Sequence, residues 1–338
     1  MNLGDVVLAT SAAAWLKKAN PSVRVTMLVR PFAAEIMENN PVVDDVLVFS
    51  YKAKQRSWGT MRAMIERIRR EKYDLCISLD RKLRPAICTF LARIPVRVVP
   101  ERIFDNKPSR VTWFYNHVVP MPSDFIHTPQ AENFQTPLRR LFNLPDLHTL
   151  PVIGLPQKNN VTNAEKLLAE LPAKKLRVAL CVQGSFPLKT WPKEHFVALI
   201  KMLLAQYDAC FYIVGTAGDS VYAAEFLTEG LPIVNFCGRT SLKDLAVLFD
   251  RSNLLVTVDT GALHIAATTS VPIVAMYGCG PADRWPPLTE KRRIITTHED
   301  CSPCHYAADA CPYLPRPKCQ WNITPEVVFQ ACAELLKE

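Results

Sequence analysis

Several stretches of the chain carry residues that could bind or move a charged group. Asp259, Thr260 and Gly261 follow an apolar run, Leu254–Val258, and precede a run of small residues that contains His264. This turn therefore lies between a predicted buried strand and a predicted helix, where free N–H groups and the helix dipole suit a phosphate. An N-cap at Asp259 or Thr260 explains the same residues. Both interpretations stay open on these residues alone, and His264 could equally be a partly buried helical histidine.

A second candidate anion site is the loop formed by residues 184–189, which contains Ser185 and Lys189. It stands between a predicted strand, residues 177–182, and a predicted helix that opens at Pro192. A lysine in a loop is commonly only solvated. Its position between a strand end and a helix start, in a domain with a second turn suited to anions, favours a ligand contact for Lys189.

Gly4 and Asp5 precede an apolar, helix-like stretch, residues 6–19, and so occupy a strand-end position of the first half. A carboxylate there could accept a proton from an attacking hydroxyl, although an acidic helix cap fits as well. No strand precedes them, so the first sheet would lack a central strand and leave ladder groups unpaired. We expect either a misassigned start or another strand in that place.

The C-terminal tail is predicted to be loop-like and holds four closely spaced cysteines. Four thiolates make a complete structural zinc set, but this spacing is tighter than that of paired zinc knuckles. Reduced thiols or an occasional disulfide are the alternatives. The residues are Cys301, Cys304, Cys311 and Cys319.

The elements that must position these residues alternate between strand and helix in both halves of the chain, which predicts two parallel sheets with helices on their faces. The predicted strands are residues 23–29, 45–49, 73–79, 96–99, 177–182, 210–214, 233–236, 254–258, 272–277 and 293–296. The predicted helices are residues 6–19, 32–38, 57–71, 83–92, 131–142, 163–171, a helix from 192, 220–227, 242–249, 262–269 and a helix from 324. Residues 100–128 are predicted to be an irregular loop over an active site, and the proline-rich stretch 143–160 to lead into an interdomain linker.

Composition places the protein among soluble globular proteins of two ordinary domains. The chain has 338 residues, of which 49% are hydrophobic and 21% charged, and eleven cysteines that we expect to be mostly reduced. It contains neither a signal peptide pattern nor the roughly eighteen uninterrupted apolar residues of a membrane helix. The net charge of +8, densest in residues 52–110, favours a phosphorylated substrate or an acidic membrane face over nucleic acid. Since GxGxxG and the Walker lysine motif are absent, a dinucleotide or P-loop site has little support.

The order of several motifs resembles glycosyltransferase family 9, the ADP-heptose:lipopolysaccharide heptosyltransferases, including heptosyltransferase II-like members. The motifs are GDVVLAT (4–10), YDLCISLDRKLR (73–84), KTWPKEHF (189–196), GRTSLKDLAVLF (238–249) and DTGALHIAATTSVPIVAMYG (259–278). The resemblance implies an α/β GT-B fold, with two Rossmann-like doubly wound parallel-sheet domains facing a central cleft. Residues 1–155 would form the acceptor-binding domain and residues 156–323 the nucleotide-sugar-binding domain. A helix in residues 324–338 could pack back on the first domain.

The resemblance also implies a role for each matching residue. Asp5 matches the proposed general base and Lys189 the lysine near the donor phosphates, and these two would be catalytic. The acceptor-binding positions would be Gly4 and Arg84. The donor-binding positions would be Ser185, Lys189, Gly238, Leu242, Asp259, Thr260, Gly261 and His264.

The implied activity is inverting transfer of L-glycero-D-manno-heptose from ADP-heptose to the inner core of lipopolysaccharide. The acceptor would be a lipid A–Kdo-type precursor, and nucleic acid would not be a partner. No cofactor would be required, although a divalent metal could stimulate the reaction. The protein would be cytoplasmic and peripheral on the cytoplasmic face of the inner membrane. The alternatives are a related GT-B transferase for another nucleotide sugar, a GT-B-like nucleotide-sugar epimerase, and a non-catalytic nucleotide- or lipopolysaccharide-binding protein. Asp80 departs from the family pattern, where Gln or His is usual, so acceptor preference could differ.

Overall fold

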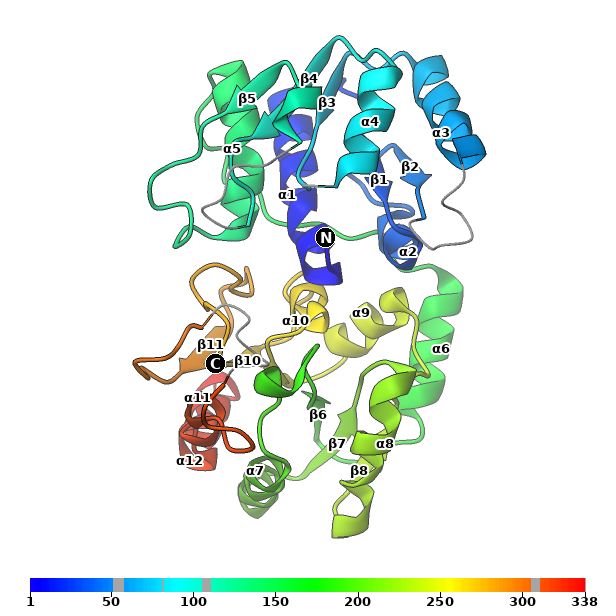
Figure 1. The fold of residues 1–338 in the computed structure, drawn as a ribbon. Coiled ribbons are helices and arrows are strands. Elements are labelled where there is room, and N and C mark those ends of the chain that lie inside the picture. Colours follow the sequence, from blue (N-terminus) through cyan, green and yellow to red (C-terminus); the bar gives the residue numbers. More distant parts are fainter. Residues whose placement is uncertain (51–57, 81, 105–110, 305–310, 338) are drawn as a thin grey trace. The chain divides into compact units, whose positions relative to one another are not determined.

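The chain folds into two compact units, Met1–Gly154 and Leu155–Glu338. The structure is a computed structural model that describes residues 1–50, 58–80, 82–104, 111–304 and 311–337. Parts of the basic stretch 52–110, of the predicted loop 100–128 and of the cysteine-rich tail lie outside the described residues. Figure 1 shows the elements of each unit.

Unit 1 contains two parallel sheets rather than the single sheet that the sequence predicts. One sheet pairs β1 with β2, and the other has the order β3-β4-β5. Strands β1 and β3 do not pair with each other, so the described strands of this unit do not join into one ladder. The strands are β1 (Thr26–Val29), β2 (Asp45–Val48), β3 (Leu75–Ile77), β4 (Val96–Pro100) and β5 (His117–Val119).

The helices of unit 1 bury their apolar residues in several small cores. Helix α1 is apolar on nearly all sides, from Val6 to Trp15, and packs against α5. Helices α3 and α4 pack together over a second core that includes Ile68 and Ile94. The helices are α1 (Leu3–Ala19), α2 (Ala34–Met37), α3 (Trp58–Glu71), α4 (Leu83–Leu91) and α5 (Gln130–Phe142), with 3-10 turns η1 (Pro31–Ala33) and η3 (Thr112–Phe114).

Unit 2 is built on one six-stranded parallel sheet with the order β11-β10-β9-β6-β7-β8. Every residue of β7, β9 and β10 is buried, as expected for a parallel sheet covered on both faces. The strand order reverses between β6 and β9, which pair directly. The strands are β6 (Leu176–Cys181), β7 (Ala209–Ile213), β8 (Ile233–Asn235), β9 (Leu254–Val258), β10 (Ile273–Tyr277) and β11 (Arg292–Thr296).

The helices of unit 2 cover this sheet, with α6 packed against α9 and α7 packed against α12. They are α6 (Lys158–Leu168), α7 (Lys193–Gln206), α8 (Ser220–Ala224), α9 (Leu242–Asp250), α10 (Gly261–Ala266), α11 (Lys318–Trp321) and α12 (Pro325–Leu335). Three 3-10 turns complete the unit: η4 (Pro187–Lys189), η5 (Ala217–Asp219) and η6 (Leu227–Glu229). None of the helices described is long and apolar enough to span a membrane.

The C-terminal helix α12 belongs to unit 2. Its apolar stripe, which includes Val328, Cys332 and Leu335, is buried in the same core as β6, β7 and β9. The stripe is spaced as the sequence predicts, but spacing alone does not reveal which surface it covers.

Two short elements stand where the sequence predicts loops. Strand β5 lies within residues 100–128 and pairs with β4, where Val99 pairs with Val118. Helix α11 lies in the cysteine-rich tail, where its Gln320 is buried. Elements of three or four residues carry too little periodicity to be recognised from the sequence.

Candidate functional site

The turn after β9 forms as the sequence predicts, but its helix is shorter. Helix α10 has six residues, and Thr260 is its N-cap, with the Thr260 side chain accepting a hydrogen bond from the Ala262 N–H at 3.0 Å. The capping interpretation of Thr260 is therefore correct. A helix of six residues also supplies a weaker dipole than the predicted one, so anion binding at this turn needs further groups.

Lys189 supplies such a group, because the structure brings it to the turn. Its Nζ lies 2.5 Å from Asp259 Oδ2, with 14% and 12% of the two side chains exposed. The pairing follows from the sheet order, since the loop after β6 and the turn after β9 leave adjacent strands at the point where the order reverses. In open α/β sheets ligands bind at this switch point, outside the carboxyl ends of the strands.

The backbone of the Lys189 loop passes very close to Gly184. A Cβ at Gly184 would lie 2.3 Å from Lys189 Cβ and 2.9 Å from the Lys189 carbonyl oxygen. Only glycine fits there without displacing the loop. Lys189 ends the 3-10 turn η4, and its Nζ lies 5.4 Å from the centre of the Phe186 ring. Gly184 and Phe186 thus fix the path of the loop and one side of the lysine.

A small pocket lies against the Lys189–Asp259 pair. Gly280, which follows β10, approaches Asp259 so closely that a Cβ there would be 2.6 Å from Asp259 Oδ2. The aromatic rings of Phe186 and Trp285 contribute apolar wall, whereas the ion pair contributes the charge. The lining residues are Phe186, Lys189, Asp259, Cys279, Gly280, Pro281 and Trp285. Its volume of about 10 Å³ is that of a single water molecule, so the pocket shows which groups surround the pair and is smaller than a ligand site.

His264 lies next to the pair as a neutral imidazole. It is 4% exposed, and burial lowers the pKa of its side chain to about 4, while the charge of Asp259 acts to raise the pKa and that of Lys189 to lower it. Its buried Nδ1 has no hydrogen-bond partner among the described residues. The interpretation of a buried helical histidine is correct, and burial favours the neutral form of its side chain.

The cysteine-rich tail supports the Lys189 loop. The sequence analysis does not predict this support. Gln320 of α11 donates a hydrogen bond from Nε2 to the Leu188 carbonyl at 2.8 Å. Trp191, just after the loop, is completely buried and donates from Nε1 to the Ile323 carbonyl at 2.9 Å. These long-range bonds leave no local sequence pattern; the only hint is the W-P pair in the KTWPKEHF motif.

The remaining donor-site candidates occupy nearby loops of unit 2. Ser185 is exposed in the Lys189 loop. Gly238 has a φ of +74°, and a Cβ there would lie 2.8 Å from Ala217 Cα, so the turn after β8 requires glycine. Leu242 begins α9, behind the N-cap Ser241.

The acceptor-side candidates lie in unit 1. Gly4 and Asp5 are in the first turn of α1, and Asp5 Oδ2 accepts a hydrogen bond from the Asn2 N–H at 3.0 Å. Asp5 thus occupies the capping position that the sequence left open as an alternative. Arg84 is the second residue of α4 and is partly buried. The amino group of Met1 lies 3.0 Å from Asp80 Oδ2, so the start of α1 lies beside the end of β3.

The tail cysteines lie close together but form no disulfide, since all eleven cysteines are free. Cys319, Cys304 and Cys311 share one apolar cluster with Cys279. Burial and the neighbouring thiols raise the pKa of Cys319 to about 11. Within the described ranges no group of three or more metal-binding side chains is arranged to hold a metal ion.

The comparison with known proteins agrees with the architecture and the motifs. The model of the family described as "Glycosyltransferase family 9 (heptosyltransferase)" matches residues 61–313, which is most of the chain. The chain belongs to this family. It is a glycosyltransferase, and its two α/β units correspond to the two domains of the GT-B fold.

The relatives of this glycosyltransferase span nearly its whole length at low identity. Lipooligosaccharide heptosyltransferase 2 of Haemophilus influenzae is 26% identical over 310 residues, covering 87% of this chain and 85% of the relative. The solved structure of ADP-heptose lipopolysaccharide heptosyltransferase II of E. coli covers 100% of this chain and 96% of its own, with a TM-score of 0.80 and 20% identity. A family 9 glycosyl transferase of Veillonella parvula gives a TM-score of 0.85 at 21% identity, with coverage of 100% and 95%.

Proposed function

We propose that this glycosyltransferase moves L-glycero-D-manno-heptose from ADP-heptose to the inner core of lipopolysaccharide, with inversion at the anomeric carbon. The observation that carries the proposal is the partly buried Lys189–Asp259 pair at the switch point of the unit 2 sheet, in a chain that belongs to family 9. The names of the relatives, heptosyltransferase 2 and ADP-heptose heptosyltransferase II, support the choice of sugar and nucleotide.

In this proposal the donor diphosphate lies against Lys189, Thr260 and Gly261. Asp259 offsets the charge of Lys189 and holds its ammonium group in place, so the carboxylate serves as an organiser of the turn or as a ligand for sugar hydroxyls. A carboxylate beside a diphosphate is unfavourable unless a cation or hydrogen-bond donors lie between them. Lys189 is that cation. The neutral His264 adds no charge to this balance.

The reaction we propose is a direct displacement. The acceptor hydroxyl oxygen forms a bond to the anomeric carbon while the bond from that carbon to the diphosphate oxygen breaks. The hydroxyl proton passes to Asp5, and ADP leaves with the negative charge, which Lys189 and the N–H groups of the turn stabilise. Gly4 and Arg84 would contact the acceptor, and Ser185, Gly238 and Leu242 the donor. The acceptor we propose is a lipid A–Kdo-type precursor, reached through peripheral contact with the cytoplasmic face of the inner membrane.

A double-mutant cycle on Lys189 and Asp259 tests the donor site. Lys189→Met leaves a partly buried carboxylate unpaired, so loss of stability alone could weaken binding. Lys189→Met combined with Asp259→Asn removes both charges and restores stability. We expect ADP-heptose to bind this double variant about 10- to 100-fold more weakly than it binds Asp259→Asn, because one charge-assisted hydrogen bond to phosphate contributes about 1.5–3 kcal/mol. If calorimetry gives the double variant and Asp259→Asn the same affinity for ADP-heptose, Lys189 stabilises the fold and does not bind the donor.

The donor itself is tested by turnover with purified protein. We expect transfer from ADP-heptose to a heptose-deficient lipopolysaccharide acceptor. Turnover of a UDP-sugar in place of ADP-heptose would favour a transferase for another nucleotide sugar. Interconversion of the sugar without acceptor would favour an epimerase, and binding of ADP without either reaction would favour a binding protein.

A further inference from the structure

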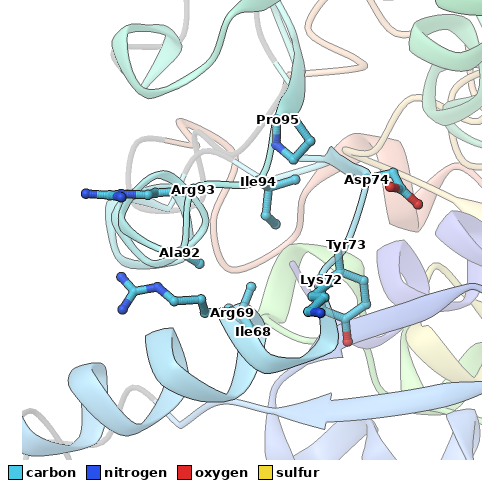
Figure 2. Close-up of a pocket in the computed structure, with 9 residues that line it drawn as sticks. All are labelled: Ile68, Arg69, Lys72, Tyr73, Asp74, Ala92, Arg93, Ile94 and Pro95. Atoms are coloured by element: carbon cyan, nitrogen blue, oxygen red, sulfur yellow. The ribbon is translucent and has the colours of Figure 1, made fainter.

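A cavity of about 560 Å³ lies in unit 1, at the edge of the sheet where strands β3 and β4 begin. Helices α3 and α4 end there, and strands β3 and β4 start directly after it (Figure 2). Arg69, Lys72 and Arg93 line the cavity together with the apolar side chains of Ile68 and Ile94. Arg69 belongs to the last turn of α3, Lys72 directly follows α3, and Arg93 lies two residues after the end of α4.

The charge of this cavity is mainly positive. Asp74 is its one lining carboxylate. Figure 2 shows the side chains of Arg69 and Arg93 extending to the same side of the pocket, while the Asp74 carboxylate lies on the other side. In the described part of the chain none of Arg69, Lys72 and Arg93 forms an ion pair with a carboxylate. Their charges are therefore open to an anion from solution.

Two features fix these cations in place. The Arg69 guanidinium donates a hydrogen bond from Nη2 to the Leu91 carbonyl at 2.8 Å, so its head is held across the gap between α3 and α4. Lys72 and Arg93 have φ values of +52° and +63°, in the left-handed region where glycine or asparagine usually ends a helix. A cation at a helix C-terminus is favoured by the dipole. The dipole does not explain why three such cations border one cavity.

The cavity is distinct from the acceptor-side candidates. Arg84 and Arg93 stand at opposite ends of α4, and the nine residues of this helix span about 13 Å. Asp80 follows the end of β3, whereas Asp74 precedes its start. The cavity thus occupies the strand-start edge of unit 1, and the proposed acceptor residues occupy the strand-end edge.

We propose that this cavity binds the phosphate group of an anionic membrane phospholipid and holds unit 1 against the bilayer surface. Arginine pairs recognise phosphate oxygens through paired N–H groups, and Arg69, Lys72 and Arg93 are exposed at this cavity, whereas Ile68 and Ile94 are buried beneath it. The inference rests on the proposed peripheral contact with the membrane, and it does not depend on the identity of the donor or on the mechanism of transfer. It names the surface of unit 1 that makes this contact.

Vesicle binding by charge-matched variants tests the proposal. The test variant combines Arg69→Gln with Arg93→Gln. Its control combines Arg67→Gln with Arg70→Gln, which removes the same charge from exposed positions of α3 that do not line the cavity. Co-sedimentation is measured with vesicles of phosphatidylcholine and phosphatidylglycerol in equal amounts. In parallel, inorganic phosphate is titrated while thermal unfolding is monitored. Arg93→Gln alone is a second test variant if the pair unfolds.

We expect the test variant to bind the anionic vesicles about 30-fold more weakly than wild type, because each basic residue at such a surface contributes about 1 kcal/mol. The control variant should lose less than about 5-fold. If inorganic phosphate stabilises wild type but not the test variant, while all three proteins bind vesicles equally, the cavity binds phosphate from a soluble molecule and the membrane contact is refuted. Equal loss of vesicle binding in both variants, with no phosphate effect, overturns the proposal. ADP-heptose affinity is unchanged in every case, which separates this test from that of the donor site.

Discussion

Replacement of Gly184 by alanine is the most direct test of how the Lys189 loop positions its lysine. The new Cβ would lie 2.3 Å from Lys189 Cβ, and ordinary contact begins at 3.4 Å, so the two carbons must separate by about 1.1 Å. The obstructing atoms include the Lys189 backbone, so a side-chain rotation cannot relieve the overlap. The loop itself has to move.

Gly184→Ala should affect both the stability of the protein and its rate of turnover. Overpacking of this kind costs about 1–3 kcal/mol of stability, and part of that cost is relieved as the loop moves. The same movement pulls Lys189 away from Asp259, which it contacts at 2.5 Å. A displacement of about 1 Å in a group that positions substrate costs about 100-fold in rate. We therefore expect Gly184→Ala to lose about 100-fold in kcat/KM for ADP-heptose while it remains folded.

Gly218→Ala is the matched control within the same unit. The nearest atom to its new Cβ is Thr216 Oγ1 at 3.5 Å, an ordinary contact, so its stability and turnover should stay close to wild type. Urea unfolding gives the stability of both variants, and steady-state turnover of ADP-heptose gives kcat/KM. If Gly184→Ala folds and retains wild-type turnover and donor affinity, Lys189 does not act from the position seen here, and the assignment of the diphosphate to this loop is refuted.

Two further predictions concern titratable side chains. Asp5→Asn should keep its fold and its affinity for ADP, because asparagine can still accept the hydrogen bond from the Asn2 N–H, but lose about 100- to 10,000-fold in kcat if Asp5 is the base; turnover close to wild type would refute that role. His264 is buried with its pKa lowered to about 4, so the unfolded state binds more protons between pH 6.5 and 4, and stability should fall by up to about 3 kcal/mol as the pH drops through this window. His264→Gln should reduce that loss, measured as the difference between urea unfolding at pH 7 and pH 5, and an identical pH dependence in the variant would contradict the buried neutral imidazole.

Much of the architecture could be predicted because long buried elements leave clear patterns. Strand β9, Leu254–Val258, has the predicted bounds, and the apolar spacing that predicts the helix after Pro192 places Phe196, Leu199 and Ile200 in the core. Short elements such as β5 and α11 were predicted as loops, because their backbone is fixed by partners far away in the sequence. The two sheets of unit 1 were predicted as one, since alternation of strands and helices indicates parallel strands but not which of them pair.

By itself the sequence determined that Asp259, Thr260, Gly261 and Lys189 stand at strand-to-helix turns of an α/β protein, because residue type and period are local properties. The tertiary structure decided that Lys189 contacts Asp259. That contact requires β6 to pair with β9, although 72 residues separate Cys181 from Leu254. It also decided that Thr260 caps a short helix and that Gln320 supports the Lys189 loop from the tail. Pairing between distant strands depends on which surfaces bury each other, and no local pattern records that choice.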